Sequence, residues 1–245
     1  MPINFDVLTP AAALRIAAVT PFTSIDFPGK LSAVVFLRGC PWRCAYCHNR
    51  WMRTRRPEES DPKWEDVEAL LKKRRGLLDG VVFSGGEPCM DPALPAAVRL
   101  VKDLGYAVGL HTSGAYPRHL KDCVNLLDWV GLDVKANPEK PEAFDAVAGI
   151  SGAHEAFLQS FEIIRAAGVP MEARTTAHPD FLSEEDILAI GRWLKERRVD
   201  TFALQIFRKA PNMQTDFDPV PTDWPSRATL DALKGLFEHF ILRRE

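Results

Sequence analysis

The alternation of short apolar runs with longer amphipathic stretches is the feature that most constrains the fold of this chain of 245 residues. The short runs have the length of strands, and the stretches between them have the apolar spacing of helices. Strands that alternate with helices build a parallel sheet with right-handed crossover connections. Six strands are predicted, at residues 33–37, 80–83, 107–111, 129–134, 170–176 and 201–207.

Helices are predicted between and after these strands, at residues 62–77, 94–104, 117–127, 142–147, 154–167, 184–198 and 226–242. Six strand–helix units are too few to close an eight-unit barrel, so we expect an open, partial α/β barrel. Because α/β barrels of this length commonly form one unit, residues 1–245 are expected to be a single domain. Its core would span about 18–209, and residues 210–245 would form a C-terminal loop and helix.

Composition argues against several classes of partner. The formal net charge is −2 and the charges of both signs are interleaved, so no basic stripe for a nucleic acid is expected. The apolar stretch 11–19 is interrupted by Arg15, so it is not expected to act as a signal peptide. No run approaches the roughly 20 apolar residues that span a bilayer, so no membrane span is expected. The five cysteines are an odd number gathered mostly in one loop, which favours a reducing cytoplasm over a disulfide framework.

Three of these cysteines, Cys40, Cys44 and Cys47, follow the first predicted strand closely. Gly39 and Pro41 indicate that the segment is a loop leaving that strand. Close thiolates suit soft metal centres, and a four-iron cluster normally takes four of them. Three thiolates would therefore leave one iron open to an exchangeable ligand.

Two other interpretations of the cysteine loop stay open. The three thiols and His48 could hold a structural zinc ion, as in a zinc-stabilised binding module without catalysis, or the cysteines could pack as small apolar side chains. Zinc sites are usually closed by a second ligand pair downstream. Neither Cys89 nor Cys123 belongs to such a pair, and both are expected to be buried thiols.

Other polar motifs also fall at the carboxyl ends of predicted strands, namely residues 84–87, 112–114, 133–135 and Arg208. In α/β barrels this is the rim where catalytic groups gather, so the sequence predicts a site there. Asp133 and Lys135 are two residues apart on a strand and therefore share a face. That pair suits the amine and carboxylate of an amino acid, although an ordinary ion pair would look the same.

Two further features are ambiguous in the same way. Gly85 and Gly86 have no Cβ and would let a ligand approach the backbone, and the Glu87 carboxylate would accept a hydrogen bond from an ammonium. The alternative is that these residues form a simple turn after the strand. Arg174 shares a strand face with Glu172 and Thr176, and a polar face inside a barrel is costly unless it binds something or is internally paired. Arg174 is thus expected to face a ligand or to pair with Glu172.

The cysteine loop, with Tyr46 before its last cysteine, resembles the cluster-binding loop of radical S-adenosylmethionine (radical SAM) enzymes. Surrounding motifs narrow the resemblance: IDFPGK at 25–30, CHN at 47–49, FSGGEP at 83–88, HTSGAYP at 111–117, GLDVK at 131–135 and RTTAHP at 174–179. Over residues 18–209 the chain resembles activating enzymes of glycyl radical enzymes, closest to the longer form of the anaerobic ribonucleoside-triphosphate reductase activating protein.

The resemblance implies an open (β/α)6 TIM-like barrel of the radical SAM type. It also implies a [4Fe–4S] cluster on Cys40, Cys44 and Cys47 as the catalytic group, with S-adenosylmethionine (SAM) as the second cofactor. The residues implied to bind SAM are Gly86 and Glu87 at its amino end, Asp133 and Lys135 at its amino and carboxylate groups, Tyr46 and His48 beside the adenine, and Thr112 or Ser113 through a hydroxyl. We also expect Gly85 to border the cofactor, Arg174 to face the ribose or carboxylate, and Arg208 to lie on the ribose side. Pyruvate formate-lyase activating enzymes carry a histidine where this chain has Arg208.

The implied reaction is reductive cleavage of SAM to methionine and a 5′-deoxyadenosyl radical, which removes a Cα hydrogen from a glycine of a glycyl radical enzyme. The expected partners are anaerobic ribonucleoside-triphosphate reductase and a flavodoxin- or ferredoxin-type electron donor. Pyruvate formate-lyase or another glycyl radical enzyme is an alternative substrate. A small-molecule enzyme of the carboxy-deazaguanine synthase kind is another, since residues 211–225 could form either a lid or a docking strip. No ferredoxin-like insert lies between Asn49 and Val81, so one cluster is expected.

Overall fold

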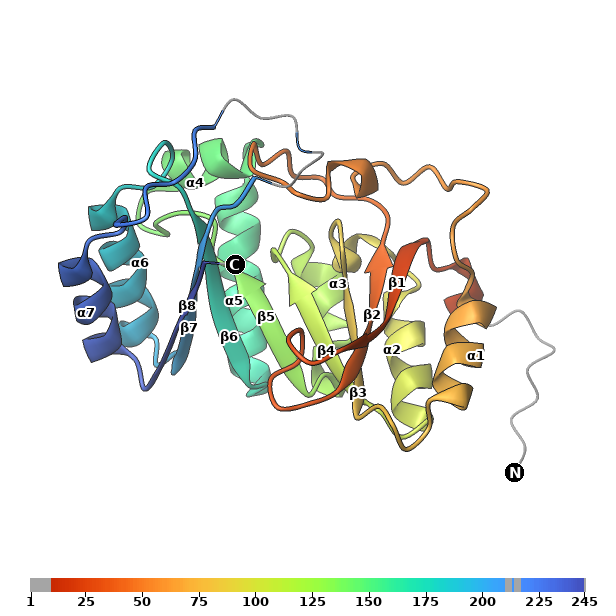
Figure 1. Cartoon of the computed structure of the whole chain (residues 1–245). Helices are drawn as coiled ribbons and strands as arrows, with labels where there is room; N and C mark the ends of the chain where they lie inside the picture. Colours follow the sequence, from red (N-terminus) through yellow and green to blue (C-terminus); the bar gives the residue numbers. More distant parts are fainter. Residues whose placement is uncertain (1–9, 210–212, 214–216, 245) are drawn as a thin grey trace.

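The computed structural model describes residues 10–209, 213 and 217–244. In this part of the chain eight strands form one sheet in sequence order. Figure 1 shows the sheet curving from β1 to β8, with the helices on its outer side. The strands are β1 (Ile16–Thr23), β2 (Ser32–Leu37), β3 (Gly80–Gly85), β4 (Ala107–Thr112), β5 (Trp129–Asp133), β6 (Met171–Ala177), β7 (Thr201–Ile206) and β8 (His239–Arg243).

All strand pairs from β2 to β8 are parallel, and β1 pairs antiparallel with β2. In the described residues β1 and β8 are the two edges of the sheet and do not pair with each other, so the barrel is open. The predicted open, partial α/β barrel is therefore confirmed. That residues 1–245 form a single domain stays a prediction.

The outer layer consists of helices that connect successive strands. Their apolar faces pack on the sheet, and their ends are set by local signals such as the capping box of Ser183 with Asp186 and the left-handed Gly168 after α5. Among the described residues, none of the helices has the length and hydrophobicity that a membrane span requires. The helices are α1 (Trp64–Lys73), α2 (Leu94–Asp103), α3 (Pro117–Lys121), α4 (Pro141–Ala148), α5 (Ala153–Ala167), α6 (Glu184–Glu196) and α7 (Arg227–Leu236).

The six predicted strands are confirmed, but the sequence prediction was wrong at two helices. The helix expected at 117–127 ends at Lys121 and is followed by a 3-10 turn at Val124–Leu126. The helix expected at 226–242 ends at Leu236. Phe237 is extended, and the chain then forms β8, which pairs with β7. Parts of the C-terminal loop, at 210–212 and 214–216, lie outside the described residues.

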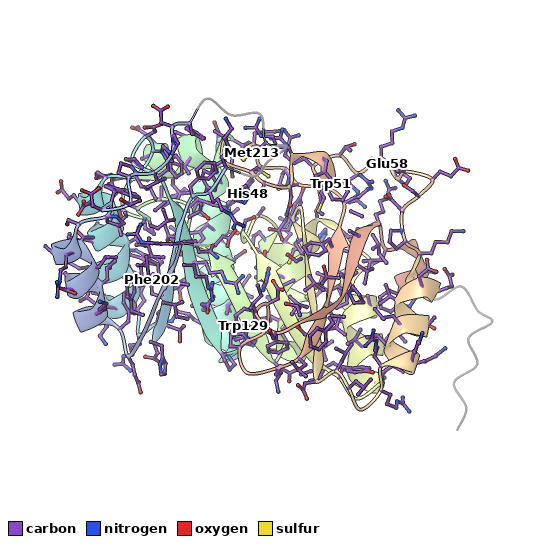
Figure 2. All side chains as sticks on the ribbon, viewed as in Figure 1. His48, Trp51, Glu58, Trp129, Phe202 and Met213 are labelled. Atoms are coloured by element: carbon purple, nitrogen blue, oxygen red, sulfur yellow. The ribbon has the colours of Figure 1, made fainter. Side chains whose placement is uncertain are left out.

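The inside of the barrel is apolar at one end and polar at the other. Phe27, Val34, Val82 and Trp129 fill the end where the parallel strands begin, and the rings of Phe27 and Trp129 stack with centroids 5.6 Å apart. Figure 2 shows Trp129 near this end and His48 near the opposite rim. The apolar plug leaves the carboxyl end of the strands as the open, polar part of the barrel.

Candidate active site

A cavity of about 230 Å³ lies at the carboxyl end of the strands, between the cysteine loop and the ends of β3, β4, β5 and β6. It brings together most of the residues predicted from the sequence. The predicted residues that line it are Cys40, Cys44, Tyr46, Cys47, His48, Gly85, Gly86, Thr112, Ser113, Asp133, Lys135 and Arg174. Two predicted residues, Glu87 and Arg208, do not line it.

The cysteine loop is held in place by backbone hydrogen bonds and by one arginine. Gly39, with a φ of 102°, donates from its N–H to the carbonyl of Met52 at 2.7 Å. The Arg43 side chain donates to the carbonyls of Cys40 at 2.7 Å and Trp42 at 2.9 Å. These bonds fix the loop backbone, so the thiols are presented to the cavity in a set arrangement.

The three thiols form a soft donor set at one wall of the cavity. Burial raises the pKa of the Cys40 thiol to about 12, with Glu87 adding to the effect, and burial also raises the pKa of Cys44. Thiolates at these positions therefore need a positive partner. An iron–sulfur cluster would supply that charge, and the donor set fits one.

Gly85 and Gly86 serve the packing of the cavity wall. A Cβ on Gly85 would lie 2.3 Å from the backbone nitrogen of Leu37, and one on Gly86 would lie 2.3 Å from the carbonyl oxygen of Gly39. Gly85 also has a φ of 122°, which favours glycine. The close approach that these glycines allow is thus to the cysteine loop itself, while both still border the cavity.

Asp133 and Lys135 lie at the end of β5 as an ion pair, with Lys135 Nζ 2.7 Å from Asp133 Oδ2. The ammonium also lies 5.5 Å from the centroid of the Tyr46 ring. Burial by itself would lower the pKa of Lys135, but the charge and hydrogen bond of Asp133, together with Tyr46 and Cys44, outweigh it and raise that pKa well above its usual value. Lys135 therefore stays charged, and the pair offers a cation and a carboxylate side by side.

Tyr46 and His48 form the aromatic side of the cavity. Tyr46 is buried and stacks on Phe181 with centroids 4.7 Å apart, and its hydroxyl has no hydrogen-bond partner among the described residues. His48 stacks on Phe207 at 5.5 Å, and its Nε2 lies 2.6 Å from the carbonyl oxygen of Arg208. An orphaned buried hydroxyl in a cavity wall suits a bound polar ligand.

Arg208 contributes its backbone carbonyl and not its side chain. The side chain lines a separate cavity with Phe207, Asp218 and Val220. The Arg208 carbonyl thus reaches the site through His48 while its side chain lies at the other cavity, and the contact of Arg208 with SAM stays a prediction.

Glu87 is fully buried beneath the rim and its carboxylate is saturated. Oε1 accepts from the Cys89 N–H at 3.0 Å and from Thr112 Oγ1 at 2.7 Å. Oε2 accepts from the Ser113 N–H at 2.8 Å and from Ser113 Oγ at 2.5 Å. Glu87 is thus placed to tie the ends of β3 and β4 together, which differs from the predicted contact with SAM. Because both hydroxyl protons are given to Glu87, Thr112 and Ser113 can only accept from a ligand.

Arg174 pairs with Glu172, and its contact with a ligand stays a prediction. Its Nε donates to Glu172 Oε1 at 2.7 Å, and its guanidinium lies 5.0 Å from the centroid of the Trp129 ring. It also lines the cavity. A Cβ on Gly131 would lie 2.7 Å from the Arg174 Cζ, so the glycine leaves the space that the guanidinium occupies.

The sequence prediction missed several lining residues, of which His111 on β4 is the most informative. Its Nε2 lies 2.9 Å from the Asp26 carbonyl, which can only accept, so the proton is on Nε2. Burial, reinforced by Arg174, lowers the pKa of His111 to about 3, so the ring is neutral. His111 is two residues after Gly109 and therefore shares its face of β4. This alternation was the sequence signal that could have placed His111 in the cavity. The other missed lining residues are Trp42, Asn49, Ser84 and Thr176.

The remaining cysteines, Cys89 and Cys123, are buried free thiols that do not line the cavity, as predicted. Burial raises the pKa of Cys123 to about 12 and raises that of Cys89 well above its usual value. The cavity therefore draws on the cysteine loop alone for its thiols.

Comparison with known proteins settles the family. The model of the radical SAM superfamily matches residues 34–194. The chain belongs to the radical SAM superfamily. Members of this superfamily use a [4Fe–4S] cluster and SAM, so the chain is a SAM-dependent enzyme. This membership rules against the zinc-stabilised binding module.

Relatives within the superfamily include activating enzymes. A Methanocaldococcus jannaschii protein with the provisional name glycyl-radical enzyme activating enzyme is 29% identical over 238 residues, covering 93% of this chain and 95% of that protein. A Streptococcus mutans pyruvate formate-lyase-activating enzyme is 31% identical over 187 residues, covering 71% of this chain and 69% of that protein. The crystal structure of QueE from Escherichia coli covers 100% of both chains with a TM-score of 0.61 and 18% identity, a likeness of fold alone.

Proposed function

We propose that this radical SAM enzyme activates a glycyl radical enzyme. The observation that carries the proposal is the similarity to the Methanocaldococcus jannaschii protein over 93% of the chain, together with the Streptococcus mutans relative. The cavity supports it, because thiols for a cluster face groups that suit the methionine end of SAM.

Within the proposal, Cys40, Cys44 and Cys47 hold the cluster. When bound, the cluster would supply the one electron that splits SAM into methionine and a 5′-deoxyadenosyl radical. The radical would take a hydrogen atom from a glycine Cα of the partner, giving 5′-deoxyadenosine and a glycyl radical.

The chain's own residues bind and orient SAM. Lys135 pairs with the carboxylate of SAM, while Asp133 and the hydroxyl lone pairs of Thr112 and Ser113 accept from its ammonium. Tyr46 and His48 border the adenine, Gly85 and Gly86 shape the wall at the amino end, and Arg174 faces the ribose or carboxylate. Glu87 holds Thr112 and Ser113 in place from behind.

The finer proposal is that the partner is anaerobic ribonucleoside-triphosphate reductase. It is supported by the motif pattern along the chain and by Arg208 at the position where pyruvate formate-lyase activating enzymes carry histidine. The electron is proposed to come from a flavodoxin- or ferredoxin-type protein in the cytoplasm. Beyond the loop the chain has only Cys89 and Cys123, which are buried apart from the cavity, so its thiols offer no second cluster site.

The test mixes the anaerobically reconstituted protein with SAM, a reductant and the candidate reductase, and records electron paramagnetic resonance spectra. A glycine-centred doublet is expected, and it should vanish when the radical-bearing glycine of the partner is replaced by alanine. A doublet only with pyruvate formate-lyase would move the assignment to that partner. Release of 5′-deoxyadenosine without a doublet in any glycyl radical enzyme would favour a small-molecule substrate of the carboxy-deazaguanine synthase kind.

A further inference from the structure

The C-terminal strand β8 brings Arg243 to the inside of the barrel. β8 lies beside β7 at the edge of the sheet, with Arg243 in register with Gln205 (Figure 1). The Arg243 guanidinium reaches the carboxylate of Glu172 on β6, with Nη1 2.9 Å from Oε1 and Nη2 3.1 Å from Oε2. This two-point geometry is the strong form of an arginine–carboxylate pair.

Glu172 receives a second guanidinium at the same time. Its side chain is 1% exposed, and Oε1 also accepts from Arg174 Nε at 2.7 Å. A carboxylate buried to this degree is costly unless it is paired and hydrogen-bonded. Two arginines on one carboxylate leave one net positive charge in this group of three, and Arg174 is the member of the group that lines the cavity.

The way Arg174 is held leaves its terminal nitrogens available. Only Nε is used by Glu172, and Nη1 and Nη2 have no hydrogen-bond partner among the residues that the structure describes. The Trp129 ring and the space beside Gly131 confine the guanidinium from other sides. Arg174 therefore offers a pair of donors to a ligand in the cavity it lines.

We propose that Arg243 is a positioning residue for SAM binding: by occupying both oxygens of Glu172, it limits Arg174 to a single bond through Nε and keeps the terminal nitrogens of Arg174 toward the cavity. Without Arg243, Glu172 Oε2 is free to accept from a terminal nitrogen of Arg174 as well. The guanidinium would then pair side-on with Glu172 and offer one donor fewer to the ligand. This inference rests on the proposed binding of SAM in the cavity.

The experiment measures the affinity of the anaerobically reconstituted, unreduced protein for SAM by equilibrium titration, so that no turnover is involved. Arg243→Gln is expected to weaken binding about tenfold, and Arg243→Lys by less, because lysine keeps the charge without the two-point fork. Arg244→Gln is the matched control at the next residue, whose side chain lines the other cavity, and it should bind like the unsubstituted protein.

A double-mutant comparison separates positioning from direct contact. In a Glu172→Gln background, Arg243→Gln should cause no further loss of affinity, since its effect passes through Glu172. Full affinity in Arg243→Gln, or a tenfold further loss in the Glu172→Gln background, would overturn the inference while the proposed function stands. If the unsubstituted protein itself does not bind SAM, the proposed function fails together with the inference. Thermal unfolding of each variant identifies any that is misfolded. If Arg243→Gln is misfolded, Arg243→Lys takes its place in both comparisons.

Discussion

The Lys135 ammonium lies 2.7 Å from Asp133 Oδ2 inside the cavity that the three thiols also line. The two residues are partly shielded, with 12% of the Lys135 side chain and 38% of the Asp133 side chain exposed. A cation and a carboxylate at this spacing match the two charged groups of an amino acid, which is why we propose that the methionine end of SAM binds here.

Replacing Lys135 by glutamine should weaken SAM binding by roughly 10- to 100-fold, since a hydrogen bond to a charged group contributes about 1.5–3 kcal/mol. The measurement is a SAM titration of the reconstituted protein. Lys140→Gln is the control. Lys140 also forms an ion pair, with Asp186 at 2.8 Å, but its side chain is 56% exposed and lies outside the cavity. Equal affinities for the two variants would contradict the assignment.

Glu87→Gln should lower the free energy of unfolding by about 1–3 kcal/mol. One carboxylate oxygen becomes an NH₂ group, which would face donors such as the Ser113 N–H or the Cys89 N–H. Urea unfolding of the variant and the unsubstituted protein gives the difference. Unchanged stability with a large loss of SAM affinity would instead support the direct ligand contact that the sequence suggested.

His111 should make the protein less stable as the pH falls. Its folded pKa of about 3 is below the ordinary 6.5, so between these values the unfolded chain binds more protons. Stability then drops by roughly 1.4 kcal/mol per pH unit below about 6.5. Between pH 7 and pH 5 the unsubstituted protein should lose about 2 kcal/mol more than His111→Gln, which keeps an N–H donor. The free energy of unfolding is measured with urea at both pH values. If the unsubstituted protein and His111→Gln lose equal amounts, the pKa of His111 is not lowered in the folded protein.

Arg208→Ala should change the affinity for SAM by less than about threefold, because the site uses the Arg208 carbonyl and an alanine keeps it. The comparison is His48→Ala, which removes both the bond to that carbonyl and the stacking on Phe207 and should weaken binding more. A loss for Arg208→Ala as large as that for His48→Ala would place its side chain at the ligand.

Much of the fold follows from the sequence because parallel strands buried on both faces appear as short apolar runs. β1 was missed since Pro21 interrupts it, which an edge strand with an irregular register tolerates. β8 was missed since its apolar residues continue the helical spacing of α7. Only pairing with β7, a contact distant in sequence, makes the segment a strand.

The site was predictable where it depends on strand ends, because the carboxyl ends of parallel strands meet at one rim. For residues that follow the end of a strand, the sequence does not predict which way the side chain points. Glu87 turns inward to the end of β4, and Arg208 turns away to another cavity. Arg243 could not be foreseen at all, because its place next to Glu172 depends on β8.

The most direct test is anaerobic reconstitution with iron and sulfide, followed by a chemical reductant and SAM. We expect four irons per chain and release of 5′-deoxyadenosine with methionine, and loss of both in Cys47→Ser but not in Cys123→Ala. A colourless protein that holds zinc, or an iron cluster that leaves SAM intact, would show that the three thiols do not hold a SAM-cleaving cluster.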